Sequence, residues 1–240
     1  MRLADRPIPW TLLLLLAVFP LVPPAAAQEP APVTPAAPQV APAETPVAAP
    51  WLRDELLALR EEDQAARMEW IKNRADTALQ EKVKAIDERT TKRVIEIIDR
   101  HGWPGKALVG LDASAAAWIL IQHSTPEVID RYLPLMKEAA EKGDLSKALV
   151  ALTVDRQLVY HGKPQIYGSQ FKAENGQWVP ETLEDPANVD QRRAEVGLGP
   201  LEEYARNLRQ AYGPPPPSET PKEAPKETPE PEDGSKPPHG

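Results

Sequence analysis

Cysteine is absent from this chain of 240 residues. Without thiols the protein forms no disulfide, performs no thiolate chemistry and offers no sulfur ligand to a metal. A lipid attached through cysteine is excluded for the same reason. The fold must therefore be stabilised by its hydrophobic core alone.

Clustered positive charge is also missing. The formal net charge is −8, and no block of lysine and arginine stands anywhere in the chain. Contact with a phosphate backbone requires such clusters. Nucleic acid is therefore excluded as a partner.

The apolar run near the N-terminus is short. It covers Thr11–Phe19, well below the about 20 residues that a membrane-spanning helix needs. Arg2 and Arg6 precede it, and Ala25-Ala26-Ala27 follows with the small-residue pattern that a signal peptidase cleaves. We predict a signal peptide at 1–27 and an exported protein, periplasmic or extracellular. Only an uncleaved segment, held by its two arginines, would keep the protein in a membrane.

Proline is abundant at both ends. Residues 28–50 are mainly proline, alanine and valine, and residues 213–240 combine proline with alternating charge. Because proline fixes φ and removes an N–H donor, neither segment can form regular helix or sheet. We predict a disordered linker and a disordered tail around one domain at 51–212. The tail is either a solubilising arm or a contact for an envelope partner.

The pattern between these segments is helical. Apolar residues recur at steps of three and four along a first helix: Leu52, Leu56, Leu59, Ala66 and Trp70. A second helix runs from Leu79 to Ile98 and ends at Gly102. A third is expected to start with Ser114 as its N-cap. Further helices are expected from Thr125-Pro126 to Gly143 and over 145–154, 187–196 and 201–211.

The pattern changes after residue 154. Leu158–Tyr160, Ile166-Tyr167 and Phe171–Trp178 are predicted to be extended, and Asn175-Gly176 is a hairpin turn dipeptide. The predicted fold is mainly α: a compact multi-helix domain with a small β-hairpin in its C-terminal third.

Asp63 lies on the apolar stripe of the first helix. A carboxylate facing the core is unfavourable unless it is paired or functional. Arg67 follows four residues later, within reach of an ion pair, and Gln64 is adjacent. The group is either a structural Asp–Arg pair or part of a pocket, in which Asp63 is catalytic and Arg67 and Gln64 bind a ligand.

Two histidines stand at predicted helix ends. His101 either complements a helix C-terminus or is catalytic. Gln122 and His123 close the third, apolar helix. Because an unperturbed histidine titrates near neutral pH, His123 is a candidate acid or base, with a satisfied core histidine as the alternative. Gln122 is a candidate ligand-binding residue.

Metal and cofactor motifs are missing. The spacing of His101, His123 and His161 does not indicate a metal site. The chain has no nucleophile elbow, glycine-rich phosphate loop or His-Glu-x-x-His helix. We expect neither a metal nor a cofactor.

A polar segment follows the fifth helix. Asp155-Arg156 precedes a loop in which Gln165, Tyr167 and Gln170 alternate with apolar or small residues. One side of this loop can present donors and acceptors to a ligand. The alternative is a well hydrogen-bonded turn that holds the hairpin.

These motifs together resemble a bacterial family known only as a domain of unknown function. The motifs are Asp63-Gln-x-x-Arg, His101-Gly-Trp-Pro, Gln122-His, Asp155-Arg and Gly162-x-Pro-Gln-x-Tyr-Gly-x-Gln. The resemblance covers nearly all of 51–212 and implies no activity. Ser169 replaces a usual threonine. After Asp87, Thr90 or Thr91 replaces a usual asparagine, which argues against a role for Asp87.

Three functions fit this sequence. The domain is a binder of a small ligand or cell-wall fragment, a hydrolase- or lyase-type enzyme with histidine and aspartate as acid and base, or a helical interaction scaffold. We predict that Asp63, His123 and Gln170 converge on a concave pocket, which would exclude the scaffold.

Overall fold

The computed structural model describes residues 47–215. Its helices are α1 (Pro50–Lys72), α2 (Thr77–His101), α3 (Lys106–Val109), α4 (Leu111–Gln122), α5 (Pro126–Glu141), α6 (Lys147–Tyr160), α7 (Val189–Glu195) and α8 (Leu201–Tyr212). Strands β1 (Phe171–Glu174) and β2 (Gln177–Pro180) form an antiparallel hairpin, and a 3-10 turn covers Pro186–Asn188. The predicted class, mainly α with a C-terminal hairpin, is confirmed. The predicted signal peptide, most of the linker and most of the tail lie outside the described residues.

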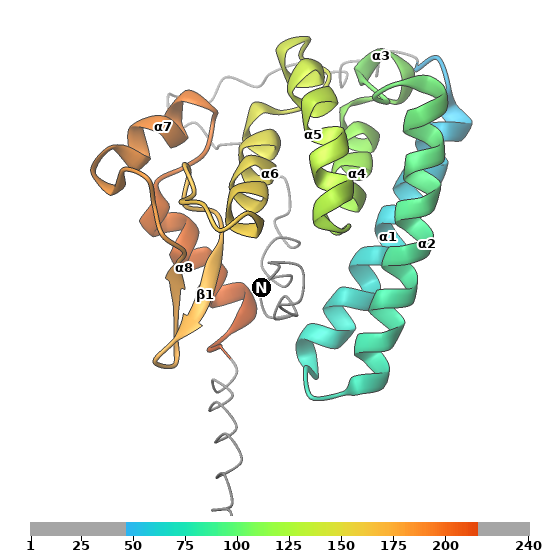
Figure 1. Cartoon of the computed structure of the whole chain (residues 1–240). Coiled ribbons are helices and arrows are strands. Elements are labelled where there is room, and N and C mark those ends of the chain that lie inside the picture. Colours follow the sequence, from blue (N-terminus) through green and yellow to red (C-terminus); the bar gives the residue numbers. More distant parts are fainter. Residues whose placement is uncertain (1–46, 216–240) are drawn as a thin grey trace, which may run out of the picture.

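Helices α1 and α2 form a long antiparallel pair along one side of the molecule (Figure 1). Proline at the first position of α1 fits a helix start, because no intrahelical N–H is lost there. The Asp76 carboxylate accepts hydrogen bonds from the backbone N–H groups of Ala78 and Leu79 and caps α2. Gly102, with φ +73°, ends α2 as predicted.

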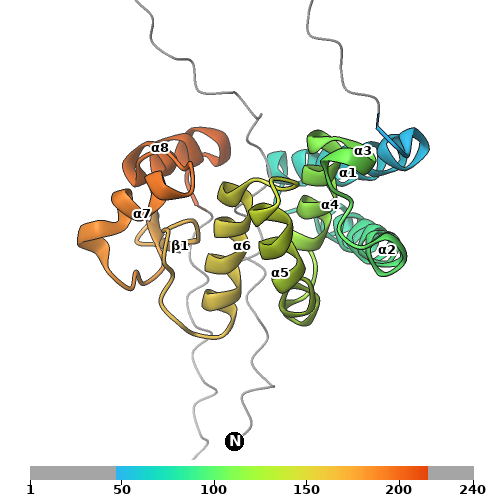
Figure 2. The ribbon, with the colours of Figure 1, turned by 90° about the horizontal axis from the view of Figure 1, so that it is seen from above.

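The main core lies where α4 packs between the α1–α2 pair and α5. Helix α4 is apolar on every side and buried almost throughout, as a central helix must be. Seen from above, the elements follow an arc from α1 and α2 through α4, α5 and α6 to the C-terminal part (Figure 2). This arrangement places the ends of α4 and α6 in the middle of the molecule.

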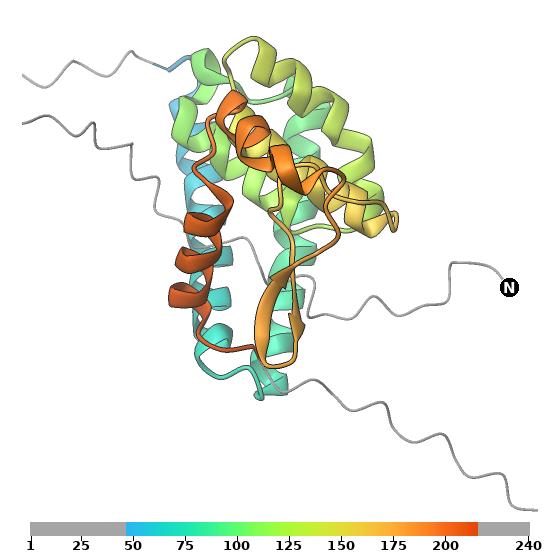
Figure 3. The ribbon, with the colours of Figure 1, turned by 90° about the vertical axis from the view of Figure 1, so that its left-hand side faces the viewer.

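The C-terminal part has a core of its own. Phe171 and Trp178 of the hairpin pack against Tyr204 and Leu208 of α8. Viewed from that side, the hairpin and α8 stand next to each other in front of the α1–α2 pair (Figure 3). Asn175 and Gly176 both have positive φ, 51° and 73°, the conformation that the predicted turn requires.

The tip of the α1–α2 pair contacts this C-terminal part. Arg74 donates a hydrogen bond to the carbonyl of Tyr212 at 2.9 Å. Its guanidinium carbon lies 6.0 Å from the ring centre of Trp178 and 5.9 Å from that of Tyr212. The first and last helices are thus joined at their far ends.

Three local predictions were wrong. Ile166-Tyr167, predicted to be extended, lies in a bend of the loop between α6 and β1. Ser114 is inside α4 and not at its N-cap, because Gly110, with φ +82°, separates α3 from α4 four residues earlier. Leu158–Tyr160 is helical and not extended, because α6 continues to Tyr160, just before Gly162 with φ +67°. Tertiary packing of α6 against α5 outweighs the strand preference of these residues. Within residues 47–215, no helix is long and apolar enough to cross a membrane.

Candidate functional site

Four charged or titratable side chains from three helices meet in the interior. Asp63 and Arg67 stand one turn apart on α1, Asp87 comes from α2, and His123 follows the last residue of α4. We call these four residues the polar cluster. Asp63, Arg67 and His123 are buried, and Asp87 is partly exposed. The cluster lies where the three helices pack together.

The Asp63 carboxylate holds the imidazole of His123. Both carboxylate oxygens lie close to Nδ1, at 3.0 and 2.9 Å. Gln64 donates a further hydrogen bond to Oδ2 of Asp63 at 2.7 Å. Nε2 of His123 has no hydrogen-bond partner in the described part of the chain.

Arg67 connects the members of the polar cluster. Its Nε lies 2.9 Å from Nδ1 of His123 and 3.3 Å from Oδ1 of Asp63, and its Nη2 donates to Asp87. Nδ1 cannot both accept from Arg67 and donate to Asp63. A bare Nδ1 lone pair would repel the Asp63 oxygens, so we assign the proton to Nδ1 and let Arg67 donate to Asp63. The lone pair of the ring is then on Nε2.

The surroundings separate the pKa values of the two carboxyl groups. Burial acts to raise the pKa of Asp63, but His123, Arg67 and the hydrogen bond from Gln64 outweigh it and hold this pKa well below its usual range. Burial raises the pKa of Asp87 to about 7. The attraction of Arg67 opposes this rise, and the charge of Asp63 adds to it.

The pKa of His123 moves in the opposite direction. Burial, followed by the charge of Arg67, lowers it to about 4, against the attraction of Asp63. At neutral pH the polar cluster therefore holds an ionised Asp63, a neutral His123 and an Asp87 that is close to half protonated.

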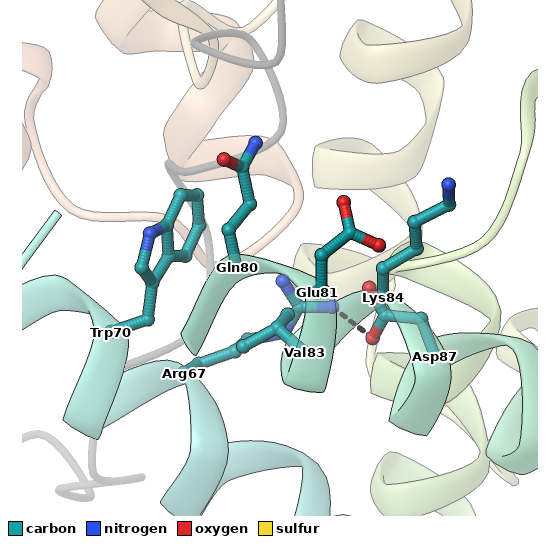
Figure 4. Close-up of a pocket in the computed structure, with 7 residues that line it drawn as sticks. All are labelled: Arg67, Trp70, Gln80, Glu81, Val83, Lys84 and Asp87. Carbon is teal, nitrogen blue, oxygen red and sulfur yellow. Dashed lines mark hydrogen bonds and ion pairs between the residues drawn. The ribbon is translucent and has the colours of Figure 1, made fainter. Parts of the chain in front are cut away.

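Asp87 and Arg67 border a pocket of about 110 Å³ between α1 and α2. Figure 4 shows Arg67 reaching from α1 to Asp87 on α2, with the side chains of Trp70, Glu81 and Lys84 around them. The indole Nε1 of Trp70 is buried and has no hydrogen-bond partner among the described residues. The pocket has room for one small functional group or a few water molecules.

The polar cluster also contains a possible set of metal ligands. One oxygen each of Asp63 and Asp87 and a nitrogen of His123 lie within 4.8 Å of one another. Two carboxylates and an imidazole suit a divalent transition metal. However, Arg67 already contacts all three groups, so a cation would have to displace its guanidinium. This geometry favours the arginine over a metal.

Gln122 and Arg156 form a second buried polar group beside His123. Nη1 of Arg156 donates to the backbone carbonyl of Gln122 at 2.9 Å. The charge of Arg156 also contributes to lowering the pKa of His123, after burial and Arg67. Both side chains were predicted to bind a ligand. Gln122 directly precedes His123, and the charge of Arg156 acts on it.

The other predicted ligand-binding residues organise the loop before the hairpin. The Asp155 carboxylate accepts hydrogen bonds from the backbone N–H groups of Ile166, Tyr167 and Ser169, at 2.8 to 2.9 Å. The side-chain amide of Gln165 binds the backbone of Gln170 and the carbonyl of Glu181.

The amide of Gln170 donates to Ser169 and not to the polar cluster. Asp63 and His123 therefore meet as expected, but neither lines the pocket between α1 and α2, and the hydrogen bonds of Gln170 belong to the loop. Asp155 and Gln165 fit the alternative prediction for this segment, a well hydrogen-bonded turn that holds the hairpin.

His101 stands apart from the polar cluster. It is exposed at the end of α2, where its ring meets Trp51 edge-on at 6.4 Å. Fourteen residues of helix separate it from Asp87, or about 20 Å. It takes no part in the site.

Asp87 is the member of the cluster that the sequence interpretation did not select. It lies four residues after Val83 and seven before Val94, both buried on α2. A carboxylate at such a position carries the same signal as Asp63 on α1. It was not selected because Thr90 or Thr91 replaces the asparagine that usually follows it in the family it resembles.

The comparisons with known proteins agree with the resemblance seen in the sequence. No curated protein and no solved structure matches the chain. One family model matches residues 50–215, most of the chain and nearly all of its described part. The chain therefore belongs to this family, the family of unknown function DUF6624.

Proposed function

We propose that the domain is an acid–base enzyme, of hydrolase or lyase type, that acts on a small molecule at the polar cluster. The observation behind the proposal is the orientation of His123. Its Nδ1 is fixed by the buried Asp63 carboxylate, and its Nε2 has no partner among the described residues. A carboxylate in this position sets the tautomer and stabilises the imidazolium that forms when Nε2 takes a proton.

Asp87 is the matching acid. Its pKa of about 7 keeps part of it protonated at neutral pH, while Asp63 is ionised. Two carboxyl groups with separated pKa values are typical of sites that need one acid and one ionised partner. Arg67 binds both and fixes their positions.

Among residues 47–215, no side chain takes the place of a nucleophile. The neighbouring Ser124 donates its hydroxyl to the carbonyl of Ile121 and is turned into the helix end. We therefore assign His123 the role of a base toward water or toward a substrate C–H bond. This leaves hydrolysis by activated water and elimination as the reaction classes.

A binder without turnover is the second candidate. It is favoured by Trp70, whose ring lines the pocket and whose Nε1 has no partner in the described residues. An aromatic face with a free donor suits recognition of a small polar molecule.

The proposed place of action is the cell envelope. It rests on the sequence of residues 1–27, with the arginines, the apolar run and the alanines at the expected cleavage site. N-terminal sequencing of the protein isolated from the envelope should find a start near Gln28, and an intact Met1 would contradict export by cleavage.

Substrate depletion distinguishes the two candidates. The full chain is incubated with a small-molecule extract of the organism that makes it, and the mixture is followed by mass spectrometry. Wild type is expected to convert at least one compound, and Asp63→Asn and His123→Gln are expected to lose at least about 100-fold in rate.

A surface pair provides the matched control. His161 lies 2.9 Å from Asp130 in an exposed histidine–aspartate pair. Asp130→Asn and His161→Gln change the same chemistry outside the cluster and should leave the rate unchanged. A compound retained but not converted would favour the binder. Equal rates in all four variants would contradict the role of the polar cluster.

A further inference from the structure

Arg156 is a buried cation without a carboxylate partner in the part of the chain that the structure describes. Only 1% of the residue is exposed. No carboxylate in the described residues lies within ion-pair distance of it, and its one hydrogen bond, from Nη1, goes to the neutral carbonyl of Gln122. A buried charge without a counter-ion is strongly unfavourable. A water molecule would supply hydrogen bonds but no charge, so the site calls for an anion.

The unused atoms of Arg156 define the shape of that anion. Nε and Nη2 are both buried and have no partner in the part of the chain that the structure describes. These two nitrogens form one edge of the planar guanidinium, and their N–H bonds run in parallel. Such an edge matches two oxygens of one carboxylate or phosphate in a bidentate pair.

The side chain of Gln122 restricts which anions fit this site. Its side chain is fully buried, and both amide atoms, Nε2 and Oε1, have no partner among the described residues. Nε2 can donate to an anion, but Oε1 needs a donor. An anion without a donor of its own, such as acetate, would leave Oε1 unsatisfied. A ligand with an N–H group and a carbonyl next to its charged end would satisfy both atoms.

We propose that Arg156 and Gln122 bind a small molecule in which a carboxylate stands next to an amide, as in an acylated amino acid or at the C-terminal end of a peptide. Arg156 takes the carboxylate on its Nε–Nη2 edge, and Gln122 pairs with the amide. This inference rests on the unpaired atoms of α4 and α6 and needs no chemistry at His123. Gln122 directly precedes His123, so this site is joined to the polar cluster through the backbone.

Small probes test the ligand class on the full chain. Backbone NMR shifts are followed during titration with N-acetylglycine, N-acetylglycinamide and inorganic phosphate at constant pH and ionic strength. N-acetylglycine is expected to bind saturably and to shift the signals of Gln122 and Arg156. N-acetylglycinamide lacks the charge and phosphate lacks the amide, so both should bind about tenfold more weakly or not at all.

Substitutions of Arg156 test the residue. Arg156→Lys keeps the charge but loses the bidentate edge, and should weaken N-acetylglycine binding about tenfold or more. Arg156→Met should abolish it without lowering the melting temperature of the ligand-free protein, because an uncompensated buried charge is removed. Arg89→Lys, at an exposed ion pair with Glu62, is the control and should bind like wild type.

The outcomes separate this inference from the enzyme proposal. Asp63→Asn is expected to keep N-acetylglycine binding even where turnover is lost. Tighter binding of phosphate, no binding of any probe, or unchanged binding in Arg156→Lys would each overturn the inference. If Arg156→Met does not fold, the lysine variant decides.

Discussion

Single residues show how the interior of this protein accommodates charge. Asp63, Arg67 and Asp87 compensate one another through direct contacts, so a helix face that is otherwise apolar can carry them. Arg156 has no such compensation within the described residues. The charges of the polar cluster are thus balanced within the fold, whereas the charge of Arg156 requires a ligand.

Replacing Asp87 should change how stability depends on pH. Its pKa rises from 3.8 to about 7 on folding, so the folded state binds more protons between these values. This contribution to stability is complete below pH 4 and is lost as the pH rises through 7. Relative to wild type, Asp87→Asn should therefore gain stability with rising pH, by up to about 4 kcal/mol. Urea denaturation at pH 4, 5.5 and 7.5 measures the free energy of unfolding of both proteins. If the value of Asp87→Asn minus that of wild type decreased with rising pH, the assignment would be contradicted.

His123 contributes with the opposite sign. Because folding lowers its pKa from 6.5 to about 4, the unfolded state binds the extra proton in this range. Its contribution is present above pH 6.5 and is lost as the pH falls toward 4. In wild type, the pH-dependent contributions of Asp87 and His123 to stability partly cancel. The comparison of Asp87→Asn with wild type is therefore more informative than the wild-type stability curve alone.

The sequence was sufficient to identify polar residues that interrupt an apolar helix face. Asp63, Arg67 and Gln64 were selected because a carboxylate interrupted a regular apolar face, and His123 because it closed an apolar helix. The partners of Asp155 and Gln165 could not be predicted, because their hydrogen bonds join residues 5 to 16 positions apart in an irregular loop. No periodic pattern records such contacts.

At the scale of elements, the loop between α6 and β1 depends on one carboxylate. Asp155 is completely buried and accepts three backbone hydrogen bonds from this loop. The loop in turn presents its carbonyl at Tyr167 to Arg193 of α7. The connection from the helical core to the C-terminal part passes through these bonds.

Removing this carboxylate should destabilise the protein. Asp155→Ala leaves three backbone N–H groups without their acceptor, and the free energy of unfolding should fall by about 3 kcal/mol or more. Chemical denaturation measures the change. Asp130→Ala, at a partly exposed ion pair with His161, is the control and should change the free energy of unfolding by about 1 kcal/mol at most. A small effect of Asp155→Ala would show that the loop holds its shape by other means.

The errors in the helix prediction have a common physical cause. Ser114 is a good N-cap residue and Leu158–Tyr160 a plausible strand by local preference. In the structure Ser114 donates to the carbonyl of Asp144 and accepts from the indole of Trp103. Long-range partners of this kind override local preferences.

At the scale of the whole molecule, the first and last helices are joined through Arg74. The α1–α2 pair, the central helices and the C-terminal part form a connected arc, and Arg74 joins its ends at Trp178 and Tyr212. The ends of α4 and α6, with His123 and Arg156 near them, lie in the middle of this arrangement.

Opening this contact should loosen the C-terminal part. Arg74→Ala removes one hydrogen bond and two cation–π contacts, and should lower stability by about 1 to 2 kcal/mol. Hydrogen exchange should become faster in β2 and at the end of α8. Arg209→Ala, which removes an exposed ion pair with Glu202 on the same helix, should have little effect on either. Unchanged exchange in Arg74→Ala would show that the ends of the arc are held independently.

The ring nitrogens of His123 provide the most direct test of the proposed acid–base site. Nitrogen-15 NMR of the full chain reports which nitrogen carries the proton and at what pH the ring is protonated. We expect the proton on Nδ1, a bare Nε2, and a pKa of about 4, well below the usual 6.5 of histidine, with Asp63→Asn disturbing this state. A proton on Nε2, with Nδ1 accepting from Arg67, would contradict the role of His123 as a base.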